Sequence, residues 1–194
     1  MNVAMMNELT EAAQALGANP AVRVVVLASE GKSFSAGADL TWMQAQVAAD
    51  RAGRMAEARR LADMLRALNE IPKPMIARVH GNAFGGGLGL ISICDTAFAV
   101  EGARFGFTET RLGIIPGTIS PYVLARIGEG MARRVFMSAR LFDAAEAQTL
   151  GLIEIAKVST PARWTSMIER EIRPNSRRAR QPQPSHDPRN WRVA

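Results

Sequence analysis

Cysteine, histidine and long apolar runs are scarce in this sequence. Its 194 residues include one cysteine, two histidines and one tyrosine. A single cysteine excludes a disulfide within the chain, and Cys94, in an apolar stretch, is interpreted as a small buried hydrophobe. No apolar run approaches the ~20 residues that span a bilayer. The first residues have neither a basic region nor an uninterrupted apolar core, so we expect no signal peptide, no membrane partner and a cytoplasmic location.

The positive charge of the chain is not spread evenly. The formal net charge is +6, but six arginines and one aspartate from residue 172 onward contribute +5 of it and leave +1 for the rest. The remaining residues give no electrostatic reason to expect DNA or RNA binding, and we expect no nucleic-acid partner. RNA binding by the arginine-rich end is kept as an alternative, which deletion of that end would test through the salt dependence of RNA affinity.

The length and the hydrophobic content of 47% suit one α/β domain with a sizeable core. Residues 22–28 are almost all apolar and β-branched, which is typical of a parallel strand covered on both faces. Further strands are predicted over residues 75–79 and 95–100. Helices are predicted over residues 3–16, ended by Gly17, and over 55–68, 87–93, 120–127, 131–137 and 143–150, with a return to a strand at 151–153. This alternation favours a parallel sheet of βαβ units.

Two turns rich in glycine and alanine are the most informative features of the chain. Residues 35–40 read Ser-Ala-Gly-Ala-Asp-Leu and residues 85–90 read Gly-Gly-Gly-Leu-Gly-Leu, each between an apolar run and a helical pattern. Small residues let a ligand approach the main chain, and the amides at such turns have no partner of their own. Either turn alone is equally compatible with tight packing. If the two converge, their amides can form an oxyanion hole.

The order of four segments identifies a family resemblance. The two turns are followed by the apolar run at 95–100 and by Phe-Gly-Phe-Thr-Glu-Thr-Arg-Leu-Gly-Ile-Ile-Pro-Gly at 105–117. From about residue 2 to residue 157 the chain resembles the enoyl-CoA hydratase/isomerase family, also called crotonases. The resemblance implies a crotonase-like α/β fold, which is a ββα superhelix with a mostly parallel sheet and helices.

The resemblance also divides the chain. Residues 1–157 are expected to form the crotonase-like core, 158–172 a remnant C-terminal helix, and 173–194 a basic, Pro-rich disordered tail. Members of the family begin with a strand pair before the first helix and end in several amphipathic helices that help to build the oligomer. We therefore expect a chain truncated at both ends or frame-shifted, with the C-terminal helical part largely missing.

In this family the substrate is a coenzyme A thioester whose carbonyl oxygen binds between two backbone amides. By motif, those amides belong to Ala38 and Gly86. The resemblance implies coenzyme A only as part of the substrate, no permanently bound cofactor and no metal, and a homo-oligomer that is a trimer or a hexamer. The residues expected to contact the coenzyme A thioester are Ala36, Gly37, Ala38, Asp39, Leu40, Gly85 and Gly86.

The expected proton donor and acceptor is Glu109. Hydratases of the family usually carry two glutamates, one shortly after the glycine triplet and one in the Phe-Gly-x-x-Glu segment. Here the second is Glu109, whereas Gly89 stands at the first position. A carboxylate in an apolar pocket has a raised pKa and can act as acid and base in turn.

These features favour a hydratase that adds water to an enoyl-CoA. The stretch from residue 85 to 123 is most similar to the branch of methylglutaconyl-CoA and carboxygeranoyl-CoA hydratases, in which glycine also replaces the first glutamate, so a branched or carboxylated acyl chain is expected. A Δ3,Δ2-enoyl-CoA isomerase, which needs one glutamate, and a non-catalytic acyl-CoA-binding protein are the alternatives. Trp42 and Met43 are interpreted as core or pocket wall.

Overall fold

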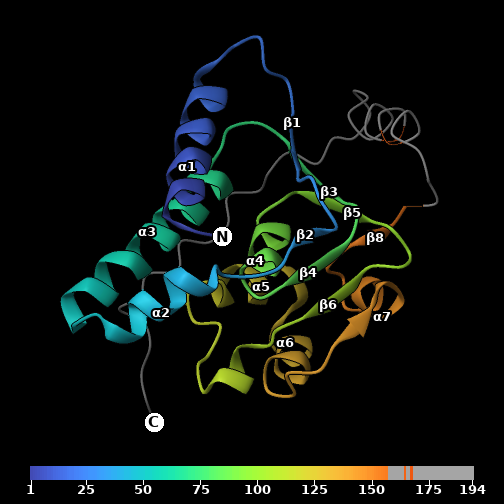
Figure 1. Cartoon of the computed structure of the whole chain (residues 1–194). Helices are drawn as coiled ribbons and strands as arrows, with labels where there is room; N and C mark the ends of the chain where they lie inside the picture. The colour runs from blue at the N-terminus through green and yellow to red at the C-terminus, as the bar shows by residue number, and fades with distance from the viewer. Residues whose placement is uncertain (157–163, 165–166, 168–194) are drawn as a thin grey trace.

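Strands that follow one another along the chain lie in two different sheets (Figure 1). The computed structural model describes residues 1–156, together with Trp164 and Met167. Within these residues the first sheet has the order β1-β3-β5-β8 and is parallel throughout. Its strands are β1 (Val25–Ala28), β3 (Met75–Val79), β5 (Thr96–Ala99) and β8 (Glu154–Ile155).

The second sheet is built from shorter strands. Its order is β2-β4-β6-β7, with parallel pairs except between β6 and β7. Its strands are β2 (Ser33–Ser35), β4 (Asn82–Phe84), β6 (Arg104–Gly106) and β7 (Phe142–Asp143). Along the chain, β1 of the first sheet leads into β2 of the second, β3 into β4 and β5 into β6. A helix follows each of these pairs. This ββα repeat places the ends of β2, β4 and β6 side by side.

The helices come close to the predicted ranges. The helix α5 has the bounds predicted from the sequence, whereas α1 continues one residue beyond Gly17, and the segment predicted as one helix over 55–68 begins earlier. The helices are α1 (Val3–Ala18), α2 (Leu40–Ala48), α3 (Arg51–Asn69), α4 (Gly86–Ser92), the 3₁₀ helix η1 (Glu109–Leu112), α5 (Ser120–Ile127), α6 (Glu129–Phe136) and α7 (Ala144–Thr149).

The expectation of a first strand covered on both faces is wrong. The strand β1 begins at Val25 instead of residue 22, none of its residues is buried, and Val26 is 41% exposed. The reason is its place at the edge of the first sheet, where it pairs only with β3 among the described residues. The central strand β3 is covered instead, since only Arg78 of its five residues is not buried.

One arginine joins distant parts of the fold. Arg126, in the last turn of α5, donates to the carbonyl oxygens of Cys94 (2.7 Å), Asp95 (3.1 Å), Gly151 (3.2 Å) and Leu152 (3.3 Å). Burial lowers the pKa of its guanidinium. These bonds connect the end of α4 to the turn that leads into β8.

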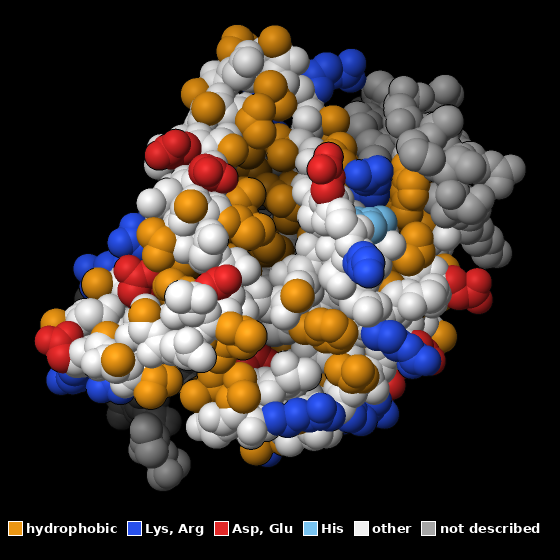
Figure 2. Space-filling model, in the orientation of Figure 1, with side chains coloured by type: hydrophobic (Ala, Val, Ile, Leu, Met, Phe, Trp, Pro, Cys, Tyr) orange, Lys and Arg blue, Asp and Glu red, His pale blue; other side chains and the backbone are white. Residues whose placement is uncertain are grey.

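The segments 158–172 and 173–194, predicted as a helix and a tail, lie outside the described residues except for two positions. Trp164 is buried and packs with Ile76, Phe98 and Ala156, and Met167 packs against the same cluster. Among the residues that the structure describes, no helix has the length and apolar character to cross a membrane. The face in Figure 2 carries acidic and basic side chains interspersed with apolar ones.

Candidate functional site

A cavity of about 850 Å³ lies where the two glycine-rich turns meet the helices α2 and α3 and the segment after β6. Its volume is within the range of small-molecule sites. Most of the side chains that line it are apolar, with Arg54, Glu57 and Glu109 as the charged exceptions. The structure thus brings segments that are far apart in the sequence to one concave surface.

The two turns lie in direct contact. A Cβ atom on Gly87 would lie 2.5 Å from the Cβ of Ser35, so no side chain fits there. A Cβ on Gly37 would lie 3.6 Å from the carbonyl oxygen of Phe84. Gly37 and Gly85 also have φ angles of 95° and 52°, which side-chain-bearing residues rarely adopt. Glycine is required at these positions by close approach and by backbone conformation.

The amides of Ala38 and Gly86 are both available at the cavity. The two residues line it, and neither N–H donates to a protein acceptor in the described part of the chain. Gly86 is the first residue of α4, whose leading amides have no partner within the helix. Met1 lies over this place: its carbonyl oxygen accepts from the Asp39 N–H at 2.8 Å, and its methyl group would lie 2.8 Å from a Cβ on Gly86.

Glu109 lies beside the second turn. Its Oε1 is 3.2 Å from the position that a Cβ on Gly85 would occupy, and its Oε2 is buried without a hydrogen-bond partner. Burial raises the pKa of this carboxyl group, against the lowering effect of its hydrogen bond with its own backbone. An accessible cavity, two open amides and a carboxylate of raised pKa can together stabilise a developing oxyanion and move a proton.

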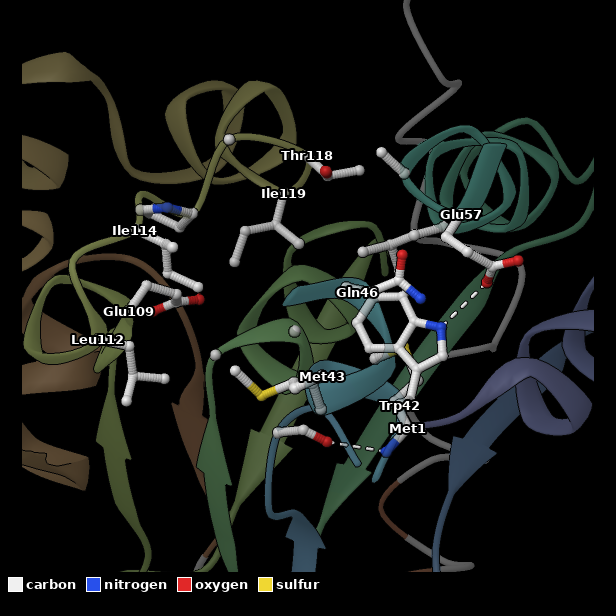
Figure 3. A pocket seen from close by; sticks show the side chains of 18 of the residues that line it. Met1, Trp42, Met43, Gln46, Glu57, Glu109, Leu112, Ile114, Thr118 and Ile119 are labelled. Atoms are coloured by element: carbon white, nitrogen blue, oxygen red, sulfur yellow. Dashed lines mark hydrogen bonds between the residues drawn. The ribbon is translucent and has the colours of Figure 1, made fainter. Parts of the chain in front are cut away.

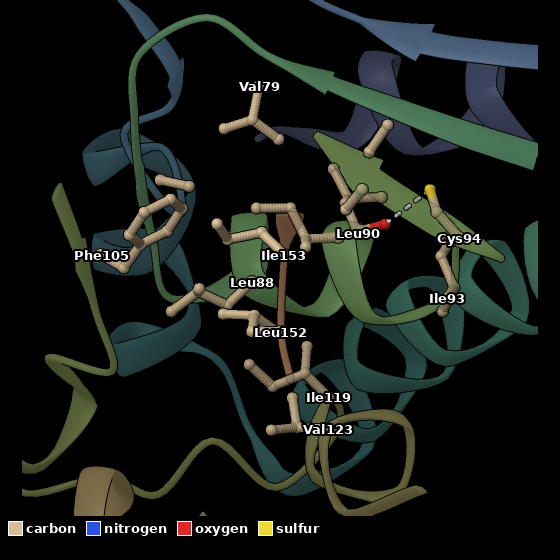
Figure 4. Close-up of a cluster of buried hydrophobic side chains, with 14 of the residues drawn as sticks. Val79, Leu88, Leu90, Ile93, Cys94, Phe105, Ile119, Val123, Leu152 and Ile153 are labelled. Atoms are coloured by element: carbon tan, nitrogen blue, oxygen red, sulfur yellow. Dashed lines mark hydrogen bonds between the residues drawn. The ribbon is translucent and has the colours of Figure 1, made fainter. Parts of the chain in front are cut away.

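Gly89 does not open onto the cavity, because Ile119 lies against it. A Cβ on Gly89 would lie 2.4 Å from the Cγ2 of Ile119 and 2.8 Å from its Cβ. Ile119 belongs to the buried cluster that includes Leu88 and Val123 (Figure 4). An apolar side chain therefore occupies the place at which a longer residue at position 89 would begin.

The wall opposite Glu109 is held by a hydrogen bond between two helices (Figure 3). The indole Nε1 of Trp42, from α2, donates to Oε2 of Glu57, from α3, at 3.0 Å. Arg60 forms an ion pair with Oε1 of Glu57 at 3.2 Å. The bond from Trp42, followed by that from Arg60, lowers the pKa of Glu57. Glu57 thus remains ionised with both oxygens engaged.

The structure brings most of the predicted site residues together. Lining the cavity are Ala36, Gly37, Ala38, Leu40, Gly85, Gly86 and Glu109. Asp39 is not among the lining residues: its carboxylate accepts from the Trp42 N–H at 2.9 Å and caps α2. Trp42 and Met43 lie in the wall, one of the two interpretations that the sequence left open. Two contacts of the site were not predicted: the hydrogen bond from Trp42 to Glu57, and the packing of Ile119 against Gly89. Neither Glu57 nor Ile119 stands in a sequence pattern that indicates a functional role.

Comparisons with known proteins identify relatives of the chain. Residues 1–168 match the family model described as enoyl-CoA hydratase/isomerase. The probable enoyl-CoA hydratase of Rhizobium meliloti is 39% identical over 167 residues, which cover 84% of this chain and 61% of that protein. The crotonyl-CoA hydratase of Syntrophomonas wolfei is 36% identical over 157 residues, or 79% and 58% of the two chains.

Among solved structures, an enoyl-CoA hydratase/isomerase (crotonase) from Legionella pneumophila matches with a TM-score of 0.83 and 39% identity, over 89% of this chain and 66% of that one. The chain spans about three fifths of the length of the curated relatives it matches. The predicted crotonase-like α/β fold is confirmed. The chain belongs to the enoyl-CoA hydratase/isomerase family.

Proposed function

We propose that this protein is an enoyl-CoA hydratase, which adds water across the α,β double bond of a coenzyme A thioester. The observation that carries the proposal is the half-buried Glu109 carboxylate, with its Oε2 out of contact with solvent, beside a turn whose Gly86 amide, like that of Ala38, is open to the same cavity. The names of the relatives, including a crotonyl-CoA hydratase, point to the same reaction.

In the proposed reaction the thioester oxygen accepts hydrogen bonds from the amides of Ala38 and Gly86. Negative charge moves onto this oxygen as water attacks Cβ, and losing one such donor costs about 3 kcal/mol of barrier stabilisation. Glu109 takes a proton from the water and delivers a proton to Cα, so that it ends the cycle as it began. Coenzyme A enters only as part of the substrate, near residues 36–40.

The acyl chain is proposed to be branched or carboxylated, on the resemblance of residues 85–123 to the hydratase branch with glycine at position 89. Arg54 is the cationic side chain among the lining residues and is the candidate partner for a substrate carboxylate. A cytoplasmic location and a trimeric or hexameric assembly stay predictions from the sequence.

A second candidate function is Δ3,Δ2-enoyl-CoA isomerisation. The observation that favours it is Ile119 against Gly89, because an apolar side chain fills the place where a second glutamate would start. A single carboxylate can move a proton between Cα and Cγ, whereas hydration is helped by a second group that orients the water.

The test is an assay of the purified protein against linear, branched and carboxylated enoyl-CoAs, with 2-enoyl and 3-enoyl forms of each, and with hydrated and isomerised products separated. Hydrated product supports the proposal, and isomerised product without hydration supports the second candidate. Glu109→Gln should lower either activity at least ~100-fold while acyl-CoA affinity stays close to that of the wild type. A wild-type protein that binds acyl-CoA but converts none of these substrates would support the alternative of a non-catalytic acyl-CoA-binding protein.

A further inference from the structure

The helix α2 forms one wall of the cavity, but little apolar packing holds it in place. None of its residues is fully buried, and Leu40 and Val47 are 75% and 82% exposed. A nine-residue helix is not stable by itself and depends on tertiary contacts for its position. The position of α2 therefore depends to an unusual extent on its polar contacts.

Those polar contacts form a continuous series. Asp39 caps the start of α2 through the Trp42 N–H, and the Trp42 indole donates to Glu57 on α3 at 3.0 Å. Glu57 accepts from Arg60, whose Nη1 donates to Oδ1 of Asn7 on α1 at 3.0 Å. The side chain of Trp42 is thus fixed to α3, and α3 to α1.

Glu57 is a positioning residue in this arrangement, and not a group that acts on the substrate. Both of its oxygens already accept hydrogen bonds, one from Trp42 and the other from Arg60. In Figure 3 it lies beside the Trp42 ring, joined to the indole by a dashed line, on the side of the cavity opposite Glu109. Its removal would leave the indole N–H without a partner and α2 without its tie to α3.

An acyl chain that starts at the Ala38 and Gly86 amides has an apolar path toward this wall. Trp42 and Met43 from α2 and Leu61 from α3 line that part of the cavity. We propose that the Glu57–Trp42 hydrogen bond fixes α2 as the end wall of the acyl site and thereby excludes long acyl chains. This inference rests on the proposed function, since it requires an acyl-CoA in the cavity.

Four variants test the hydrogen bond between Trp42 and Glu57. Trp42→Phe keeps an aromatic ring and removes only the N–H, and Glu57→Leu removes the acceptor. Glu57→Gln keeps an oxygen that can accept, and the double variant Trp42→Phe/Glu57→Leu asks whether the two residues act as one. Asp63→Leu is the matched control: Asp63 is also an acidic residue of α3 with an i,i+3 arginine partner, Arg66 at 3.0 Å, but it does not line this cavity.

For each variant we would measure kcat/KM with crotonyl-CoA and with trans-decenoyl-CoA, and the calorimetric affinity for butanoyl-CoA and decanoyl-CoA. The decenoyl-to-crotonyl ratio should rise about tenfold in Trp42→Phe and in Glu57→Leu, the size of effect that small changes in an apolar pocket produce. The double variant should match the singles, and Glu57→Gln and Asp63→Leu should keep the wild-type ratio. The affinity ratio should move in the same way.

Several results would overturn the inference. They are an unchanged ratio in folded Glu57→Leu, independent effects of Trp42 and Glu57 that multiply in the double variant, or the same change in Asp63→Leu. Circular dichroism establishes that each variant is folded. A wild-type protein that binds no linear, branched or carboxylated acyl-CoA would instead refute the proposed function, and the inference with it.

Discussion

At the scale of single residues, the half-buried carboxyl group of Glu109 gives the free energy of unfolding a pH dependence. Because burial raises its pKa above the ordinary 4.5, the folded protein holds this proton at pH values where the unfolded chain has released it. The free energy of unfolding therefore falls as pH rises from the unfolded pKa to the folded one. Glu109→Gln lacks this loss and should be more stable than the wild type at neutral pH.

The measurement is urea denaturation of wild type and Glu109→Gln at pH 7 and near pH 3. The stability gained by the variant at pH 7 should disappear at the acidic pH, where the glutamate is protonated in both states. A gain that grows on acidification would contradict the raised pKa. The same titration predicts that the proposed hydratase activity is lost as Glu109 takes up its proton, at a pH above 4.5.

Gly89 and Ile119 should behave as one packing unit. Gly89→Ala places a Cβ within 2.4 Å of the Ile119 Cγ2, and such overpacking costs about 1–3 kcal/mol. Ile119→Ala removes that Cγ2, so the double variant should be more stable than the two single losses predict, by about 0.5–3 kcal/mol of coupling. Urea denaturation of the four proteins measures this coupling, and strict additivity would contradict it.

A glutamate introduced at position 89 would meet the same obstacle. Gly89→Glu should not produce a second catalytic carboxylate unless Ile119 is also shortened. The sequence could identify position 89 as the place of the missing glutamate, because the spacing of the family motif indicates it. It could not identify Ile119 as the residue that fills the space, because that contact joins α4 to the start of α5 across the fold.

Residues that stand in a sequence motif could therefore be predicted. Residues whose part in the site comes only from a contact in the folded chain could not. Glu109, Ala38 and Gly86 could be singled out because their segments carry glycine and aromatic patterns that sequence alone shows, and the structure places all three at one cavity. Glu57 stands in a polar helix in which several charged side chains look alike. Its role depends on the rotamer of Trp42 and on the angle between α2 and α3, which no local pattern specifies.

At the scale of elements, two helices with the same cap allow a controlled comparison. Asp39 caps α2 and Asp143 caps α7, each by accepting a backbone N–H at 2.9 Å. Asp39→Ala and Asp143→Ala should each lower the free energy of unfolding by about 1 kcal/mol. Only Asp39→Ala should also weaken acyl-CoA binding, because Asp39 adjoins the Ala38 amide and α2 bounds the cavity.

Calorimetric titration with a saturated acyl-CoA, alongside urea denaturation, tests this comparison. Asp39→Asn should restore both stability and affinity, since asparagine caps a helix about as well as aspartate. Equal loss of affinity in Asp39→Ala and Asp143→Ala would mean that the effect is general instability. Loss of affinity in Asp39→Asn would mean that the carboxylate contacts the ligand directly.

Long elements with a clear period were predicted well. The helix Ser120–Ile127 and the strand β3 both have their predicted bounds. The second sheet was not predicted, because strands of two or three residues are too short to show an alternation of apolar and polar side chains. The bounds of α2 were not predicted, and α3 begins at Arg51 instead of residue 55, after the cap that Asp50 provides.

At the scale of the whole molecule, Arg126 holds the last strand of the core to the rest. Arg126→Lys keeps the charge but cannot reproduce the fork that reaches four carbonyl oxygens, so it should cost about 1.5–3 kcal/mol. Arg133→Lys is the control, because Arg133 is exposed and its contact with Glu129 is 3.5 Å long. That change should remain within about 0.5 kcal/mol of the wild type in urea denaturation.

The hydrogen bonds from Arg126 to four carbonyl oxygens have a consequence for the folding kinetics. Their acceptors lie at residues 94–95 and 151–152, so the guanidinium finds all of them only after the turn before β8 has docked on the assembled sheet. Interactions that form after the rate-limiting step slow unfolding without speeding folding. Stopped-flow measurements on Arg126→Lys should show an unchanged refolding rate and an unfolding rate raised roughly ten- to hundredfold, as that loss of stability requires. The residue then sets how long the native state lasts, and hardly affects how fast it forms.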